Sequence, residues 1–210
     1  MHINPKDQTK KENYKLLIGS ILPRPIAFVT SRTPEGTINA APFSFYNVVA
    51  TDPPMIGISC ARKPGNVMKD TALNIQESGE FVIQVVDTDN VKAVNDCSID
   101  YPADMSEVTE TGLTLKDSRM IGVPGVQEAK IRMECKLSEI IPMGGTNGAP
   151  SADFVIGEIV YFDIDDALYE EGRIDTEGLG PVGRLAGTTF GDIGRTYSMK
   201  RKSYEEVKDN

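Results

Sequence analysis

Residues 23–74 constrain the fold of this chain more than any other stretch, because strand-forming runs and a basic loop follow one another there. The apolar run 26–29 is rich in residues that favour strands, and prolines stand on both sides of it. Pro34-Glu35-Gly36 then combines a fixed φ with a residue that tolerates positive φ, which predicts a hairpin turn. Another strand is predicted over 55–61, followed by a basic loop that opens a helix.

The second half of this hairpin predicts a polar surface that a ligand could approach closely. Phe43 and Phe45 alternate with Ser44 and Tyr46, so we expect one face to point inward and the other to offer hydroxyl groups. Small side chains let a flat molecule lie against the backbone of a strand. They recur here at Ala40, Ala41, Ser44, Gly57 and Ser59. Such strands beside a cationic loop are suited to a planar ring with a phosphate tail.

The rest of the chain adds further strands and only short helices. Helices are predicted over 13–20, within 65–79 (capped by Asn66 or Asp70 and ended by Gly79) and over 87–95, capped by Asp87 or Thr88. Strands are predicted over 81–86 and 154–164, with a mobile loop over 144–150. Residues 98–128 read as a long irregular insertion with one short strand near Leu113. Many strands with few helices predict a mainly β fold, a closed antiparallel barrel.

The clearest strand signal lies at residues 131–138. Apolar residues occupy every second position from Ile131 to Leu137. The positions between and after them are Arg132, Glu134, Lys136 and Ser138. We expect the apolar face to pack in the core and the charged face to meet solvent.

Length and charge limit the classes of partner. A chain of 210 residues is most simply one domain, here residues 1–210. Asp and Glu (31) outnumber Lys and Arg (22), giving a net charge of −9 that disfavours binding to nucleic acid or anionic lipid. An anionic ligand would therefore need a local cationic pocket. The sequence contains no apolar run of about 18 residues and begins with a polar segment, so we expect a cytoplasmic protein without a membrane segment.

The reactive side chains argue against several kinds of chemistry. Three distant cysteines, Cys60, Cys97 and Cys135, do not form a disulfide pattern or a zinc motif. The one histidine, His2, lies in a frayed terminus, which disfavours histidine acid–base catalysis and a Ser-His-Asp triad. The acidic residues between 163 and 171 have no calcium-loop spacing, so we expect a solvated rim and no metal site.

Two motifs each allow a functional and a plain interpretation. Residues 178–183 match Gly-x-Gly-x-x-Gly, but an acidic loop precedes them and Pro181 disfavours a following helix, so we interpret them as a loop. Arg62, Lys63 and Lys69 surround Pro64-Gly65 and a helix start. They could form a phosphate site with the helix N-terminus, or a solvated basic loop.

Several motifs in order make the chain resemble the flavin reductase-like family with the FMN-binding split-barrel fold, which includes flavoredoxin. They are Pro23-Arg24-Pro25-Ile26-Ala27, residues 39–44 with Asn47, Asp52-Pro53-Pro54, Lys69-Asp70-Thr71 with Asn74, Gly157-Glu158-Ile159-Val160 and residues 181–187. The resemblance covers residues 14–187, the expected core. It implies an FMN-binding split barrel that forms a homodimer with the flavin at the subunit interface.

The resemblance also implies which residues hold the cofactor. Arg62, Lys69 and Thr71, with Asp70 in the same motif, are the expected phosphate ligands. The ring and its ribityl chain are expected to border Thr30, Ser31, Asn39, Ala41, Pro42, Phe43, Ser44, Asn47, Ser59 and Cys60. Cys60 is more simply a packed hydrophobe than a redox nucleophile. Arg184 could reach the ring or pair with the acidic stretch.

The implied reaction is the transfer of hydride or electrons from NAD(P)H, or from a redox partner protein, through FMN. No catalytic side chain is expected, since this chemistry belongs to the cofactor. One alternative is an FMN-binding electron carrier without enzymatic activity, which the missing nicotinamide motif would fit. Another is a split-barrel enzyme that uses a deazaflavin, pyridoxal phosphate or haem; the single histidine makes haem ligation a poor fit.

Overall fold

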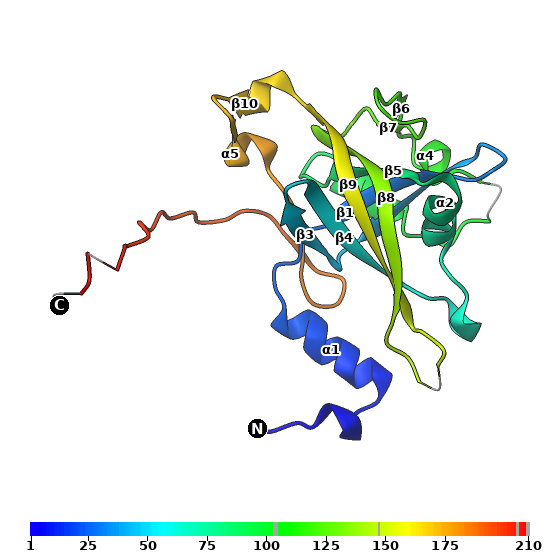
Figure 1. Ribbon diagram of the computed structural model, residues 1–210, viewed down its shortest axis with the longest axis horizontal. Coiled ribbons are helices and arrows are strands. Elements are labelled where there is room, and N and C mark those ends of the chain that lie inside the picture. The colour runs from blue at the N-terminus through cyan, green and yellow to red at the C-terminus, as the bar shows by residue number, and fades with distance from the viewer. Residues whose placement is uncertain (103–104, 147, 205, 209–210) are drawn as a thin grey trace.

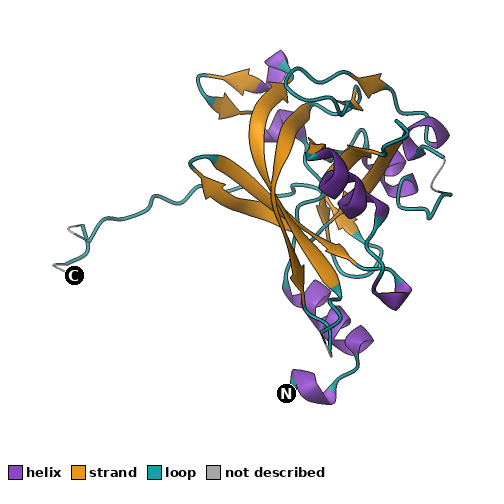
Figure 2. Cartoon of the chain, turned by 45° about the vertical axis from the view of Figure 1, so that its right-hand side comes forward, coloured by secondary structure: helices purple, strands orange, loops and turns teal. Residues whose placement is uncertain are grey.

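The computed structural model is built on one seven-stranded antiparallel sheet (Figures 1 and 2). It describes residues 1–102, 105–146, 148–204 and 206–208. The strand order is β2-β1-β5-β8-β9-β4-β3. The bounds are β1 Ala27–Arg32, β2 Ile38–Phe43, β3 Tyr46–Thr51, β4 Pro54–Ala61, β5 Glu80–Val85, β8 Ile131–Met143 and β9 Ala152–Ile164.

The two edge strands of this sheet, β2 and β3, are neighbours in the sequence. Only Ser44 and Phe45 connect them, so the sheet must curl until the end of β2 lies beside the start of β3. The backbone N–H of Ser59 on β4 donates to the carbonyl of Phe45 at 2.8 Å, which holds the β2 corner against the far side of the sheet. The result is a barrel, as the strand-rich pattern predicts.

Alternate residues of the strands fill the barrel interior. Val29, Ile58 and Ile83 are fully buried in one cluster with Phe81 and Cys135. Helix α2, Asp70–Ser78, adds Ala72 and Ile75 to the same cluster, so it packs on the barrel through its apolar stripe. Gly79 ends this helix in the left-handed conformation, as predicted.

A second buried cluster lies on the outer side of β1 and β2. It joins Phe28 and Ile38 to Val94 of α3 (Val91–Asp96), to Val108 of α4 (Glu107–Glu110) and to Val126. Much of the predicted irregular insertion therefore covers the barrel. It contains the short strands β6, Leu115–Lys116, and β7, Gly125–Val126. The predicted short strand falls two residues after Leu113.

Because the insertion packs against the sheet, the prediction that β8 has one solvent-facing side is wrong for two residues. Arg132 and Glu134 are 6% and 3% exposed, although the alternating pattern predicts a solvent-facing side for both. The Glu134 carboxylate accepts the backbone N–H groups of Arg119 and Met120, both at 2.7 Å. Arg132 donates to backbone carbonyls between Val126 and Ala129. Both side chains therefore hold the insertion to the sheet.

The corner between β2 and β3 overturns another prediction. Phe43 is buried, but the chain bends at Ser44 and Phe45, and Phe45 is 40% exposed. The two phenylalanines therefore do not share an inward face, and residues 46–51 form a strand of their own.

The predicted hairpin turn is confirmed: Gly36 has φ of +99°, and Thr33 N–H donates to the Thr37 carbonyl at 2.9 Å.

Three predicted helices are present with different starts or caps. Helix α1 spans Lys10–Ser20 and begins after Thr9, which forms a capping box with Glu12. Lys69, and neither Asn66 nor Asp70, is the N-cap of α2, and it makes no side-chain cap bond. Helix α3 begins after Asn90, because the Asp87 carboxylate bonds the N–H groups of Asp89 and Asn90 in the turn before it.

The remaining elements are short. They are η1 Pro5–Asp7, η2 Pro64–Asn66, η3 Asp166–Leu168, β10 Tyr169–Glu170, β11 Arg173–Ile174, α5 Thr176–Leu179, β12 Gly183–Arg184 and β13 Phe190–Gly191. The Gly-x-Gly-x-x-Gly match thus overlaps the end of helix α5 and leads into strand β12, the reverse of a dinucleotide fingerprint. In Figure 1, α1 stands apart from the sheet and the C-terminal segment runs away from it.

Two remaining observations concern the loops and the helices. Of the predicted mobile loop, residue 147 lies outside the described residues, and the rest joins β8 to β9. Within the part of the chain that the structure describes, every helix is too short or too polar to cross a membrane.

Gly157 on β9 gives a test of the packed interior. A Cβ at this position would overlap the Phe81 ring, which is fully buried. Gly157→Ala should therefore lower the free energy of unfolding by about 1–3 kcal/mol, the usual cost of overpacking a core. Gly19→Ala is the control, because its Cβ meets nothing within 4 Å and alanine favours a helix. Urea unfolding should show a loss for Gly157→Ala and no loss for Gly19→Ala; equal stability of the two variants would contradict the packing.

Candidate functional site

A cavity of about 450 Å³ lies where β2, the basic loop after β4 and the segment after α3 meet, and we call it the loop cavity. Its walls come from Asn39, Ala41 and Pro42 on β2, Arg62, Lys63, Pro64, Lys69, Asp70 and Thr71 in the basic loop and α2, and Cys97, Ser98, Ile99, Asp100, Tyr101 and Glu107. The structure thus brings together Asn39, Ala41, Pro42, Arg62, Lys69, Asp70 and Thr71 of the predicted site.

The three cations of the basic loop have different surroundings. Arg62 makes two bonds, at 2.8 and 2.6 Å, to Asp153, whose side chain is 1% exposed. Its third nitrogen donates to the Asn66 carbonyl, so Arg62 is used to hold the loop. Lys63 pairs with Asp70 at 2.7 Å. Among the described residues, Lys69 alone of the three has no carboxylate partner.

Lys69 also stands at the start of α2, where the first backbone N–H groups have no side-chain cap. A helix N-terminus carries a partial positive charge, which adds to the ammonium group of the lysine. Asp70 in the first turn offsets part of that charge, but its carboxylate is paired with Lys63. This end of the loop cavity is therefore the place best suited to an anionic group.

Polar pairs fix α2 against the β1–β2 hairpin. Asn39 donates to the Thr71 hydroxyl at 3.0 Å, and Asn74 donates to the Ser31 hydroxyl at 3.2 Å. Thr30 donates to the Pro124 carbonyl at 2.6 Å. Thr30 and Ser31 are fully buried, so their hydroxyls position the strand and do not line the loop cavity.

The other predicted ring contacts lie away from the loop cavity. Phe43 and Cys60 belong to the barrel interior, and burial raises the pKa of the Cys60 thiol to about 12, so Cys60 is a packing residue. Ser59 is half-buried on β4. Asn47 is exposed on β3, and its side chain accepts the N–H of Val48.

A second cavity, of about 380 Å³, adjoins the first, and we call it the arginine cavity. Pro42 and Ser98 line both cavities, so the two cavities are neighbours. Its other walls come from Tyr14, Arg24, Ile26, Ser44, Val94, Asn95, Arg184, Thr188 and Phe190. The Arg184 guanidinium lies 4.3 Å from the Phe190 ring centroid, and among the described residues it forms no ion pair with the acidic stretch.

Arg24 is the buried centre of this second cavity. Its guanidinium donates to the carbonyls of Ile18 and Ile21 at the end of α1 and of Leu185, each at 2.9 Å. It also reaches the Ser44 hydroxyl at 3.5 Å. One arginine therefore joins the N-terminal helix, the barrel corner and the segment after β12.

Sequence reasoning missed two parts of this surface. Arg24 lies in the Pro-Arg-Pro motif, which could have suggested it as a site residue. The wall formed by Ser98, Ile99, Tyr101 and Glu107 comes from a segment without periodicity, so no local signal marks it. Glu107 accepts the N–H of Ala40 at 2.8 Å, and burial raises the pKa of its carboxyl group.

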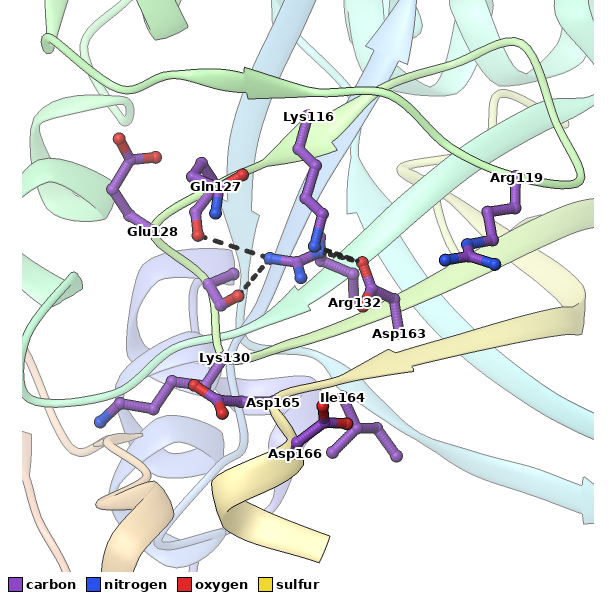
Figure 3. A pocket seen from close by; sticks show the side chains of 11 residues that line it. Lys116, Arg119, Gln127, Glu128, Lys130, Arg132, Asp163, Ile164, Asp165 and Asp166 are labelled. Carbon is purple, nitrogen blue, oxygen red and sulfur yellow. Dashed lines mark hydrogen bonds and ion pairs between the residues drawn. The ribbon is translucent and has the colours of Figure 1, made fainter.

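A third cavity, of about 490 Å³, lies beside the ends of β8 and β9 (Figure 3). Four cations (Lys116, Arg119, Lys130, Arg132) and four carboxylates (Glu128, Asp163, Asp165, Asp166) line it. Asp163 accepts from Arg132 at 2.8 Å and from Lys116 at 2.9 Å, and Figure 3 shows both pointing at it. Because its charges balance and its buried arginine is already bonded, this cavity serves structure better than ligand binding.

The sequence of residues 18–178 matches the flavin reductase like domain. The match covers most of the chain, so the protein belongs to the flavin reductase-like family, as the motifs predict.

Three solved structures resemble this chain along nearly its whole length. Nitrilotriacetate monooxygenase component B from Bacillus cereus is 49% identical, with a TM-score of 0.93, over 95% of this chain and 98% of its own. The 2-nitrobenzoate 2-nitroreductase NbaA of Pseudomonas fluorescens is 33% identical, with a TM-score of 0.86, over 97% and 98%. A split-barrel protein of Shewanella frigidimarina, 21% identical with a TM-score of 0.81 over 96% and 100%, shows the shared fold. The predicted split-barrel fold class is confirmed.

Asp163 makes stability depend on pH. Its bonds to Arg132 are the main cause that lowers the pKa of its carboxyl group from 3.8 to about 2. The ion pair therefore stabilises the fold fully above about pH 4, and the contribution is lost as the pH falls through about 2. Asp163→Asn should lower the free energy of unfolding by about 1–2 kcal/mol at pH 7, allowing for partial exposure of the carboxylate. The difference in free energy of unfolding between Asp163→Asn and the wild type should shrink towards pH 2. The control is Asp166→Asn, at an exposed neighbouring position, which should change the free energy of unfolding little at either pH.

Proposed function

We propose that this protein binds FMN and transfers hydride or electrons from NAD(P)H, or from a protein donor, to an acceptor. The observation that carries the proposal is the loop cavity beside β2, where Lys69, which has no carboxylate partner among the described residues, and an uncapped helix start lie at one end. An elongated ligand with one anionic end fits that distribution of charge. When bound, FMN supplies the redox chemistry, and the barrel holds it in place.

The phosphate of FMN would lie at Lys69, Thr71 and the start of α2. Lys69 supplies the charge, and the helix start adds backbone N–H donors. Arg62 contributes charge to the same region, while its bonds to Asp153 keep the loop in position. Lys63 neutralises Asp70, which would otherwise repel the phosphate.

The ring and ribityl chain would lie along the end of β2. Asn39, Ala41 and Pro42 line the loop cavity, and Ser44 lines the neighbouring one. Their small or flat side chains leave the backbone accessible to a planar group. The buried Thr30, Ser31 and Phe43 would act indirectly, by holding this strand and α2 rigid.

The exposed apolar side chains of β3 favour a homodimer. Val48 and Val49 of β3 are 61% and 47% exposed, Phe45 just before the strand is 40% exposed, and β3 pairs with β4 on one side only among the described strands. An unpaired edge with apolar side chains is a ready surface for a second copy. A dimer formed there would also enclose the barrel corner that leads to the proposed ring position.

The main rival is an FMN-binding electron carrier without NAD(P)H oxidation. The similarity to a nitroreductase and to a monooxygenase component favours an enzyme. A deazaflavin in place of FMN is the other alternative, and it would use the same phosphate position.

Absorbance spectra test the proposal. The purified protein, supplied with FMN and made anaerobic, should show flavin bands that bleach when NADH or NADPH is added. Flavin bands that persist would favour the carrier. A protein that takes up no flavin would overturn the proposal, and uptake of a deazaflavin alone would favour the alternative cofactor.

Lys69→Ala tests the phosphate position. Loss of one charge-assisted contact should weaken FMN binding at least about tenfold, since such a bond contributes about 1.5–3 kcal/mol. Riboflavin, which lacks the phosphate, should bind both proteins alike. Lys92→Ala, at an exposed position of α3, is the control for lost charge. Equal weakening for FMN and riboflavin in a titration of flavin fluorescence would contradict a phosphate role. Arg62→Ala is unsuitable, because it would leave the buried Asp153 carboxylate unpaired.

A further inference from the structure

We propose that the arginine cavity is a binding site for a small planar aromatic carboxylate, and that Arg184 recognises its carboxylate group. The inference deepens the proposed function by naming the class of a second substrate. It rests on that function only where it places the flavin ring beside Pro42, the residue shared by the two cavities.

The charge of the arginine cavity favours an anion. Its lining contains two cations, Arg24 and Arg184, and no aspartate or glutamate. The loop cavity, by contrast, has three cations (Arg62, Lys63, Lys69) and three carboxylates (Asp70, Asp100, Glu107) in its lining. The charged side chains that line the arginine cavity are therefore all positive, although the chain as a whole has a net charge of −9.

Of the two arginines, Arg184 is the one whose N–H groups are available to bind a ligand. Arg24 is 6% exposed, and its guanidinium donates to three backbone carbonyls and to the Ser44 hydroxyl. Its role is therefore to hold the walls of the cavity together. Within the described part of the chain, the Arg184 side chain donates one hydrogen bond, to the Gly187 carbonyl at 2.9 Å. Stacking on the Phe190 ring holds its plane while its remaining N–H groups stay available. A fixed, planar guanidinium binds a carboxylate through two parallel bonds.

The size and surface of the cavity fit a small aromatic body. A volume of about 380 Å³ is near the lower end of the range of about 300–1,000 Å³ for ligand sites. Ile26, Val94 and Pro42 provide apolar walls, and the half-exposed Tyr14 of α1 adds an aromatic ring at the rim. The apolar walls would contact the ring of the ligand, and Arg184 would hold its carboxylate.

Benzoate and its neutral analogue benzamide are the probes. Calorimetric titrations use the protein saturated with FMN and, separately, without flavin. Benzoate should bind the wild type at least tenfold more tightly than benzamide. Arg184→Gln should weaken benzoate binding about tenfold and leave benzamide binding unchanged, while Arg184→Lys should recover part of the loss. Arg173→Gln, an exposed arginine on β11 away from the cavity, is the matched control and should behave as wild type.

Equal affinities for benzoate and benzamide in the wild type would overturn the inference, and this comparison holds even if Arg184→Gln fails to fold. An unchanged benzoate affinity in a folded Arg184→Gln variant would overturn it as well. If the protein takes up no FMN but still prefers benzoate through Arg184, the proposed function fails and the anion site stands. If FMN binds and is reduced but benzoate does not bind, the proposed function stands and the anion site is overturned.

Discussion

The two-residue connection between β2 and β3 is the constraint on which this structure depends. These strands are the opposite edges of a seven-stranded sheet, and Ser44 with Phe45 spans them. So short a link forces the sheet to curl until its two edge strands come together at this corner, and the curled sheet encloses the core of Val29, Ile58 and Ile83. The same link places the end of β2 at the rim of the barrel, where both cavities meet at Pro42.

Two arginines hold the segments around that rim in place, one through an ion pair and the other through backbone carbonyls. Arg62 uses a buried carboxylate, Asp153, to fix the basic loop, and removing the arginine would leave that carboxylate buried without its charge partner. Arg24 uses backbone carbonyls of α1 and of Leu185, so it satisfies a helix end and a loop at once. With both arginines engaged, Lys69 and Arg184 are, among the described residues that line the two cavities, the cations with free donors, one in each cavity.

The insertion after α3 adds a second layer that the barrel alone would lack. Its segment 98–107 forms a wall of the loop cavity, and Glu107 bonds the backbone of β2. Further along, the backbone of Arg119 and Met120 is held by Glu134 on β8. Charged residues that would otherwise face water thus become buried anchors, each with bonding partners, as burial of charge requires.

From the sequence it was possible to predict most of the long strands, the hairpin turn at Gly36, the end of α2 at Gly79 and the family, because these depend on local periodicity, turn chemistry and short motifs; the separate strand β3 was missed. The tertiary structure alone decided that Arg132 and Glu134 are buried, that Arg62 pairs with Asp153, and that residues 98–107 line the loop cavity. Each of these contacts joins segments far apart in the chain. A local pattern records which face of a strand is polar, but only the folded chain decides whether water or another segment covers that face.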